Sequence, residues 1–143
     1  METIQEIQQE IVEEFDMFSD WMEKYDYLIA LGKDLPLIDD AFKTDDNIIK
    51  GCQSKVWLHA EMDGDNILFT ADSDAIITKG IIALMIRVLS NHTPEEILNA
   101  DMAFIDKIGL KEHLSPTRAN GLLAMIKQIK FYALAYQTKS NRQ

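Results

Sequence analysis

The chain has 143 residues, of which 47% are hydrophobic and 27% are charged, and its formal net charge is −10. This length and composition are typical of one globular domain, so we expect a single domain over residues 1–143. The acidic charge disfavours binding to nucleic acid or anionic lipid, and no apolar run reaches the roughly 20 residues that a membrane helix needs. The N-terminal METIQEIQQE lacks the pattern of a signal peptide, so we expect a cytoplasmic protein without a membrane or nucleic-acid partner.

The N-terminal part of the chain predicts two amphipathic helices. Thr3 and Glu6 have the spacing of a capping box, and apolar residues then recur at helical intervals. Ser19 is a candidate cap for a second helix, which should end near Gly32. The segment 33–47 is rich in Asp and should be an irregular connection.

The middle of the chain predicts a β-hairpin. Apolar and polar residues alternate over 56–62, the turn signal Asp63-Gly64 follows, and a second apolar run covers 67–70. Residues 48–49 are a candidate for a short third strand. Residues 51–53 would then lie in a tight surface connection that leads into the hairpin.

The C-terminal half predicts helices again. Residues 76–89 are apolar around most of a helical circumference, which indicates a buried central helix. Thr93-Pro94 and Ser115-Pro116 each combine a cap with a proline at the first helical position, and 104–108 suggests another short helix. The order of elements predicts an α+β fold in which a small antiparallel sheet of about three strands packs against helices.

Cys52 is the only cysteine, so it cannot form an internal disulfide or supply the several thiolates of a typical iron–sulfur or structural zinc site. An isolated cysteine is most often a small buried apolar residue. Three neighbours favour a reactive thiol instead. Gly51 permits a tight turn, Lys50 and Lys55 can stabilise a thiolate, and 53–54 is polar where a core segment would be apolar.

A thiolate alone does not select a reaction, because peroxide reduction, acyl transfer and persulfide transfer all begin with one. Acyl transfer would need a histidine, and the chain has His59, His92 and His113. We interpret His59 as a packing residue on a strand and His92 as a solvated loop residue, whereas His113 could reach a site. None has metal-ligand spacing, so no metal site is expected.

Charged residues near the predicted helix starts have simpler interpretations. Asp72 and Asp74 precede the central helix, where capping is the first explanation and partner contact the second. Arg118 lies in the first turn of the last helix, where it opposes the helix dipole, which suggests a carboxylate in the fold or on a partner.

Three segments resemble the SufE family, and the similarity covers nearly the whole chain. They are Gly51-Cys52-Gln53-Ser54-Lys55-Val56-Trp57, the stretch DSDAIITKGIIA at 72–83, and the stretch HLSPTRANGL at 113–122. Thr78 stands where the family pattern has an aliphatic residue and Thr117 where it has serine. We expect neither difference to touch the chemistry.

The resemblance implies a fold shared with the IscU and NifU scaffolds and a role in iron–sulfur cluster assembly. Cys52 would accept persulfide sulfur from a PLP-dependent cysteine desulfurase of the SufS or CsdA kind, stimulate that enzyme, and pass the sulfur to a SufB-containing scaffold complex. The PLP would belong to the partner, and no cofactor is expected on this chain. The supporting loop would be Gly51, Gln53 and Ser54, and the candidates for partner contact or for shaping the site are Asp74, Lys79, His113 and Arg118.

Two alternatives remain at this point. A one-cysteine thiol peroxidase would oxidise Cys52 with peroxide, and a non-catalytic interaction module would leave Cys52 inert. For a sulfur carrier we expect Cys52 to be partly buried in the free protein and exposed on docking, because a persulfide must be shielded from oxidants and reductants.

Overall fold

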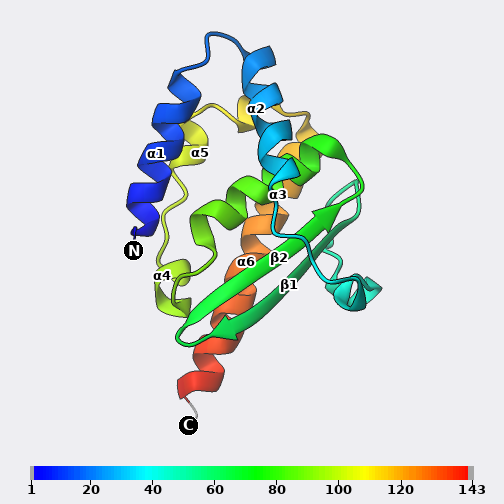
Figure 1. The fold of residues 1–143 in the computed structure, drawn as a ribbon, viewed down its shortest axis with the longest axis vertical. Helices are drawn as coiled ribbons and strands as arrows, with labels where there is room; N and C mark the ends of the chain where they lie inside the picture. The colour runs from blue at the N-terminus through cyan, green and yellow to red at the C-terminus, as the bar shows by residue number, and fades with distance from the viewer. Residues whose placement is uncertain (1, 142–143) are drawn as a thin grey trace.

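The computed structural model describes residues 2–141 and has an α+β architecture, in which a β-hairpin packs against helices (Figure 1). The two strands are β1 (Val56–Asp63) and β2 (Asn66–Ser73). The α-helices are α1 (Ile4–Asp16), α2 (Trp21–Lys33), α3 (Ile76–Leu89), α4 (Pro94–Leu98), α5 (Phe104–Lys107) and α6 (Pro116–Asn141). Short 3-10 helices are η1 (Asp40–Phe42), η2 (Asp45–Asn47) and η3 (Lys111–His113).

The hairpin forms in the predicted place. Its strands pair antiparallel from Val56 opposite Ser73 to Asp63 opposite Asn66. Gly64, with φ of 63°, occupies the first position of the two-residue turn, where a type II′ hairpin takes glycine. The alternation along β1 buries one face against α3 and α6 and leaves the other face partly exposed.

The expected third strand is wrong. Within residues 2–141 the sheet has two strands, and Ile48 makes only an isolated antiparallel bridge to Trp57 on the outer side of β1. Leu37 makes a similar parallel bridge to Ala71 on β2. The segment between α2 and β1 therefore follows both edges of the hairpin without extending it, since η1 and η2 interrupt its extended backbone.

Helix α3 is the centre of the core, as its apolar sequence predicts. Ten of its residues are buried, and the eight apolar ones from Ile81 to Leu89 join one hydrophobic cluster with residues from α1, α2, both strands, α5 and α6. Gly80 lets α2 approach closely, because a Cβ there would lie 2.3 Å from the carbonyl oxygen of Leu28. Dense packing of this kind fixes the position of the N-terminus of α3 relative to the hairpin.

Helix starts agree with the capping signals except at two places. Thr3 and Thr93 form capping boxes as predicted, but the cap of α2 is Asp20 and not Ser19, because the Asp20 carboxylate accepts the Glu23 backbone N–H. Helix α3 begins after Ala75 without a side-chain cap. The expectation that an aspartate caps α3 is therefore wrong, and both aspartates before it have other partners.

Candidate functional site

Cys52 lies in the loop between η2 and β1, where the sequence predicted a surface turn. Gly51 has φ of 96°, a backbone conformation that side chains with a Cβ rarely adopt. This turn directs Cys52 back toward α6, where Gly121 has no side chain and a Cβ on it would lie 3.5 Å from the Cys52 sulfur. The thiol donates a weak hydrogen bond to the Gly121 carbonyl oxygen at 3.7 Å.

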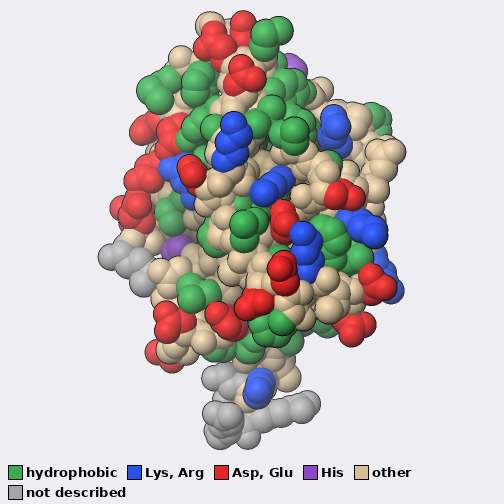
Figure 2. Space-filling model, turned by 45° about the vertical axis from the view of Figure 1, so that its right-hand side comes forward, with side chains coloured by type: hydrophobic (Ala, Val, Ile, Leu, Met, Phe, Trp, Pro, Cys, Tyr) green, Lys and Arg blue, Asp and Glu red, His purple; other side chains and the backbone are tan. Residues whose placement is uncertain are grey.

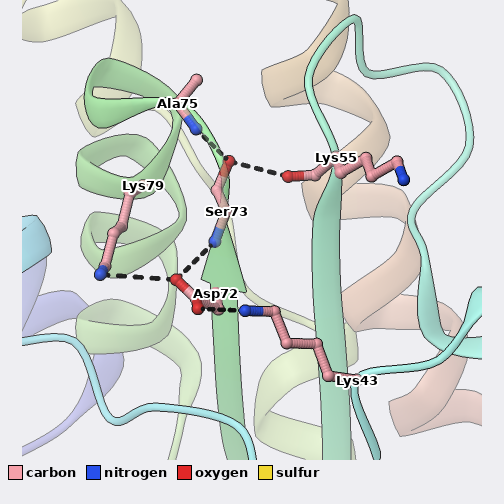
Figure 3. Close-up of polar contacts among 6 residues, drawn as sticks. All are labelled: Lys43, Lys55, Asp72, Ser73, Ala75 and Lys79. Carbon is pink, nitrogen blue, oxygen red and sulfur yellow. Dashed lines mark hydrogen bonds and ion pairs between the residues drawn. The ribbon is translucent and has the colours of Figure 1, made fainter. Parts of the chain in front are cut away.

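The loop is fixed at both ends. At its start, the Ile49 backbone N–H donates to the Val56 carbonyl at 2.8 Å. At its end, the Lys55 N–H donates to the Asp74 carboxylate at 3.0 Å. The Ser73 hydroxyl also donates to the Lys55 carbonyl at 2.9 Å (Figure 3). Between these anchors, the thiol bond to Gly121 is the only hydrogen bond that residues 50–54 make within the described part of the chain.

Asp72 joins three elements beside this anchor. Its carboxylate accepts from Lys43 at 2.9 Å, from the Ser73 backbone at 2.8 Å, and pairs with Lys79 on α3 at 3.4 Å (Figure 3). Burial by itself would raise the pKa of Asp72, but the hydrogen bonds from Lys43 and Ser73 and the charge of Lys79 together lower it. Lys79 thus contacts Asp72, and Asp74 contacts the backbone of Lys55.

The thiol is half-buried, and burial raises its pKa above that of a free cysteine. The expectation that Lys50 and Lys55 stabilise a thiolate is therefore wrong for the free chain. Both lysines lie on exposed backbone that flanks the loop, while the sulfur faces the interior. The partial burial expected of a carrier is what the structure shows.

A small cavity of about 40 Å³ lies beside the Cys52 sulfur. The loop, α3 and α6 each contribute to its wall, which consists of Cys52, Gln53, Ser54, Thr78, Ile81, Thr117, Arg118, Gly121 and Met125. Thr78 and Thr117, the two departures from the SufE pattern, both line this cavity, so they lie closer to Cys52 than expected. A space of this size admits a group about as large as a water molecule.

The remaining candidates lie at different distances from this cavity. Arg118 lines it from the first turn of α6 and takes part in no ion pair among residues 2–141. His113 does not line it. Its ring stacks on Trp21 with centroids 3.9 Å apart and contacts the Gly109 carbonyl, so any contact of His113 with a partner stays a prediction.

Sequence reasoning missed Ser73 and Gly121 as residues that hold the loop. Both lie in segments that resemble the SufE family, but no spacing rule connects them to Cys52 because they are far apart in the chain. A larger cleft of about 430 Å³ lies between α1, α4 and α5, and its lining contains no thiol. Cys52 and its cavity are therefore the better candidate for sulfur chemistry.

Figure 2 brings forward the side of the molecule that carries the segment between α2 and β1. Lys and Arg side chains on this side stand among acidic and apolar ones, while acidic side chains are dense along the left edge. Lys50, Lys55 and Arg118 are exposed near Cys52, although the whole chain is acidic.

The fold and the site together define a class of protein, a small α+β domain that presents one shielded thiol on an anchored loop. Residues 9–133 match the family described as SufE, Fe-S metabolism associated domain. The chain belongs to the SufE family.

Two relatives support this assignment, and one solved structure has the same fold. The chain is 41% identical over 132 residues to "SufE-like protein 1, chloroplastic/mitochondrial" of Arabidopsis thaliana, covering 92% of this chain but only 36% of that protein. It is 40% identical over 126 residues to an uncharacterized SufE-like protein of Rhizobium meliloti, covering 85% of this chain and 90% of the relative. The solution structure of a hypothetical protein from Thermus thermophilus has the same fold, with a TM-score of 0.77 at 19% identity over 92% of this chain and 96% of that one.

Membrane helices and metal clusters are both missing from the described residues. Helices long and apolar enough to cross a bilayer are absent from residues 2–141. In the same part of the chain, no group of three or more His, Cys, Asp or Glu side chains is placed to hold a metal ion.

Proposed function

We propose that this protein is a sulfur carrier, in which Cys52 accepts sulfur from the persulfide of a PLP-dependent cysteine desulfurase. The observation that supports it best is the half-buried thiol at the centre of an anchored loop, in a chain of the SufE family. Members of this family usually work with cysteine desulfurases, and here the partner would be of the SufS or CsdA kind. The sulfur would then pass to a SufB-containing scaffold complex in the cytoplasm.

The transfer step is a thiol–persulfide exchange. The Cys52 thiol loses its proton, and the resulting thiolate attacks the terminal sulfur of the donor persulfide. A new S–S bond forms on Cys52 while the S–S bond of the donor breaks, and the donor cysteine leaves as a thiolate. No oxidant or reductant is consumed, because the sulfane sulfur only changes its carrier.

The geometry supports exposure of the thiol on docking. One weak hydrogen bond to Gly121 holds Cys52 inward, whereas stronger bonds at Ile49 and Lys55 hold the ends of the loop. A partner can therefore turn the loop outward without unfolding its anchors. Exposure to water would remove the burial that raises the pKa of Cys52, so docking would also promote the thiolate.

The peroxidase alternative has less support. Peroxide reduction needs an accessible thiolate in the free protein, and burial favours the protonated thiol here. An inert interaction module would not need the cavity beside Cys52. We propose in addition that residues 1–143 act as one domain and that Asp74, Lys79 and Arg118 shape the site or the partner contact.

The experiment measures turnover of a cognate cysteine desulfurase with and without this protein. Wild type should raise the turnover rate at saturating cysteine, and Cys52→Ser should give no stimulation although its fold is unchanged by circular dichroism. Stimulation by Cys52→Ser equal to that of wild type would refute the carrier function and support an interaction module.

A further inference from the structure

The wall of the Cys52 cavity contains one buried hydroxyl group that the transfer step does not use. Thr78 lies in the first turn of α3, and only 6% of its surface is exposed. Its hydroxyl makes no hydrogen bond to any other described residue, although the side chain lines the cavity next to the Cys52 sulfur. Polar groups of buried side chains usually have a hydrogen-bond partner within the protein or in water.

The hydroxyl oxygen of Thr78 is accessible to a water-sized probe. Among residues 2–141, no side-chain nitrogen or oxygen is both sealed from a water-sized probe and without a partner. Because Thr78 has no partner, its oxygen must touch open space, and the cavity of about 40 Å³ is the space that it lines. The hydroxyl is therefore free to donate to a group that enters the cavity.

We propose that the cavity is the binding site of the transferred sulfur atom and that the Thr78 hydroxyl donates a hydrogen bond to the terminal sulfur of the Cys52 persulfide. This inference rests on the proposed function, since it concerns the product of the transfer. The cavity adjoins the Cys52 sulfur, so the added atom can enter it without opening the loop. Hydrogen bonds to an anion are stronger than neutral ones, and burial strengthens them further.

The surroundings of the persulfide are otherwise almost without charge. The loop contributes Gln53 and Ser54, α3 contributes Thr78 and Ile81, and α6 contributes Arg118, which is the one charged residue among those that line the cavity. Arg118 is exposed and is the same in every variant of the test. The titration of the persulfide should therefore report on the Thr78 hydroxyl when Arg118 is left in place.

The test loads Cys52 chemically, so that it does not depend on any desulfurase. The Cys52 thiolate attacks an inorganic polysulfide, which leaves as a polysulfide anion shorter by one sulfur. The persulfide anion is then alkylated by iodoacetamide with release of iodide, and mass spectrometry follows the rate against pH. Wild type is compared with Thr78→Val, which removes the hydroxyl at similar shape, and with Thr78→Ser, which keeps it.

Thr78→Val should shift the pH of half-maximal alkylation upward by about one unit, which is a tenfold loss of persulfide anion at a given pH below that midpoint. Thr78→Ser should stay close to wild type, and Thr70→Val on the outer face of β2 should give no shift. Coincident pH profiles for wild type and Thr78→Val, both folded, would overturn the inference. A Thr78-dependent profile without any sulfur transfer from a desulfurase would refute the carrier function and leave the sulfur site standing.

Discussion

At the scale of single residues, the protonation state of Cys52 determines how fast its thiol reacts. Burial raises the pKa of its thiol, so the thiolate is scarce at neutral pH in the folded chain. Iodoacetamide should therefore alkylate native Cys52 at least about tenfold more slowly at pH 7 than the same chain unfolded in urea. A native rate equal to the unfolded rate would contradict the shielded thiol.

The same shift in pKa couples stability to pH. Between the unfolded and the folded pKa of Cys52, the native state binds more protons, so the free energy of unfolding falls as pH rises through this window. The contribution is complete below the unfolded pKa. Cys52→Ser serves as the control in urea denaturation at several pH values, because it should remove this part of the pH dependence and leave the rest.

Residue patterns predicted some of these details and not others. Gly51 and Cys52 were placed correctly in a surface turn, because the turn follows from local sequence. The raised pKa of Cys52 was not predicted, since it comes from burial of the thiol. This burial involves residues such as Gly121 and Thr78, which approach Cys52 only in the folded chain. His92 shows the same limit. It was expected to be solvated, but it is 3% exposed and its ring nitrogens contact the carbonyls of Ser90 and Glu2.

At the scale of elements, the contact between α2 and α3 fixes the start of α3 and with it the anchor of the loop. A Cβ on Gly80 would lie 2.3 Å from the Leu28 carbonyl oxygen, a backbone atom that cannot move alone. Gly80→Ala should lower the free energy of unfolding by about 2–3 kcal/mol. Urea denaturation measures it.

Gly121→Ala is the matched control, since its Cβ would meet its nearest neighbour, the Cys52 sulfur, at 3.5 Å, an ordinary contact distance. Alanine also favours the helix by about 0.5–1 kcal/mol over glycine. Gly121→Ala should therefore unfold at the same urea concentration as wild type or a higher one. Equal destabilisation by both substitutions would show that close helix approach is not the reason for Gly80.

The elements themselves were largely predictable. Alternation over 56–62 and the Asp63-Gly64 turn specify the hairpin, and the apolar circumference of 76–89 specifies the buried helix. The third strand was wrong because two apolar residues at 48–49 fit an isolated bridge as well as a strand. The ion pairs of Asp72 with Lys43 and Lys79 could not be predicted either, because they join three separate segments.

At the scale of the whole molecule, the protein combines an acidic chain with three exposed basic side chains near its one thiol. The net charge of −10 disfavours binding to nucleic acid, while Lys50, Lys55 and Arg118 are exposed around the Cys52 loop. The core centred on α3 holds the anchors of that loop in place. In the proposed function, the Cys52 loop turns outward on docking while these anchors stay in place.

The most direct test of this account is intact-protein mass spectrometry after incubation with a cognate cysteine desulfurase and cysteine. Wild type should gain the mass of sulfur, reversible by a reductant and located at Cys52 by peptide mapping, and Cys52→Ser should stay unmodified. The absence of added sulfur on wild type, with a desulfurase shown to be active, would contradict the central claim that Cys52 is a sulfur acceptor.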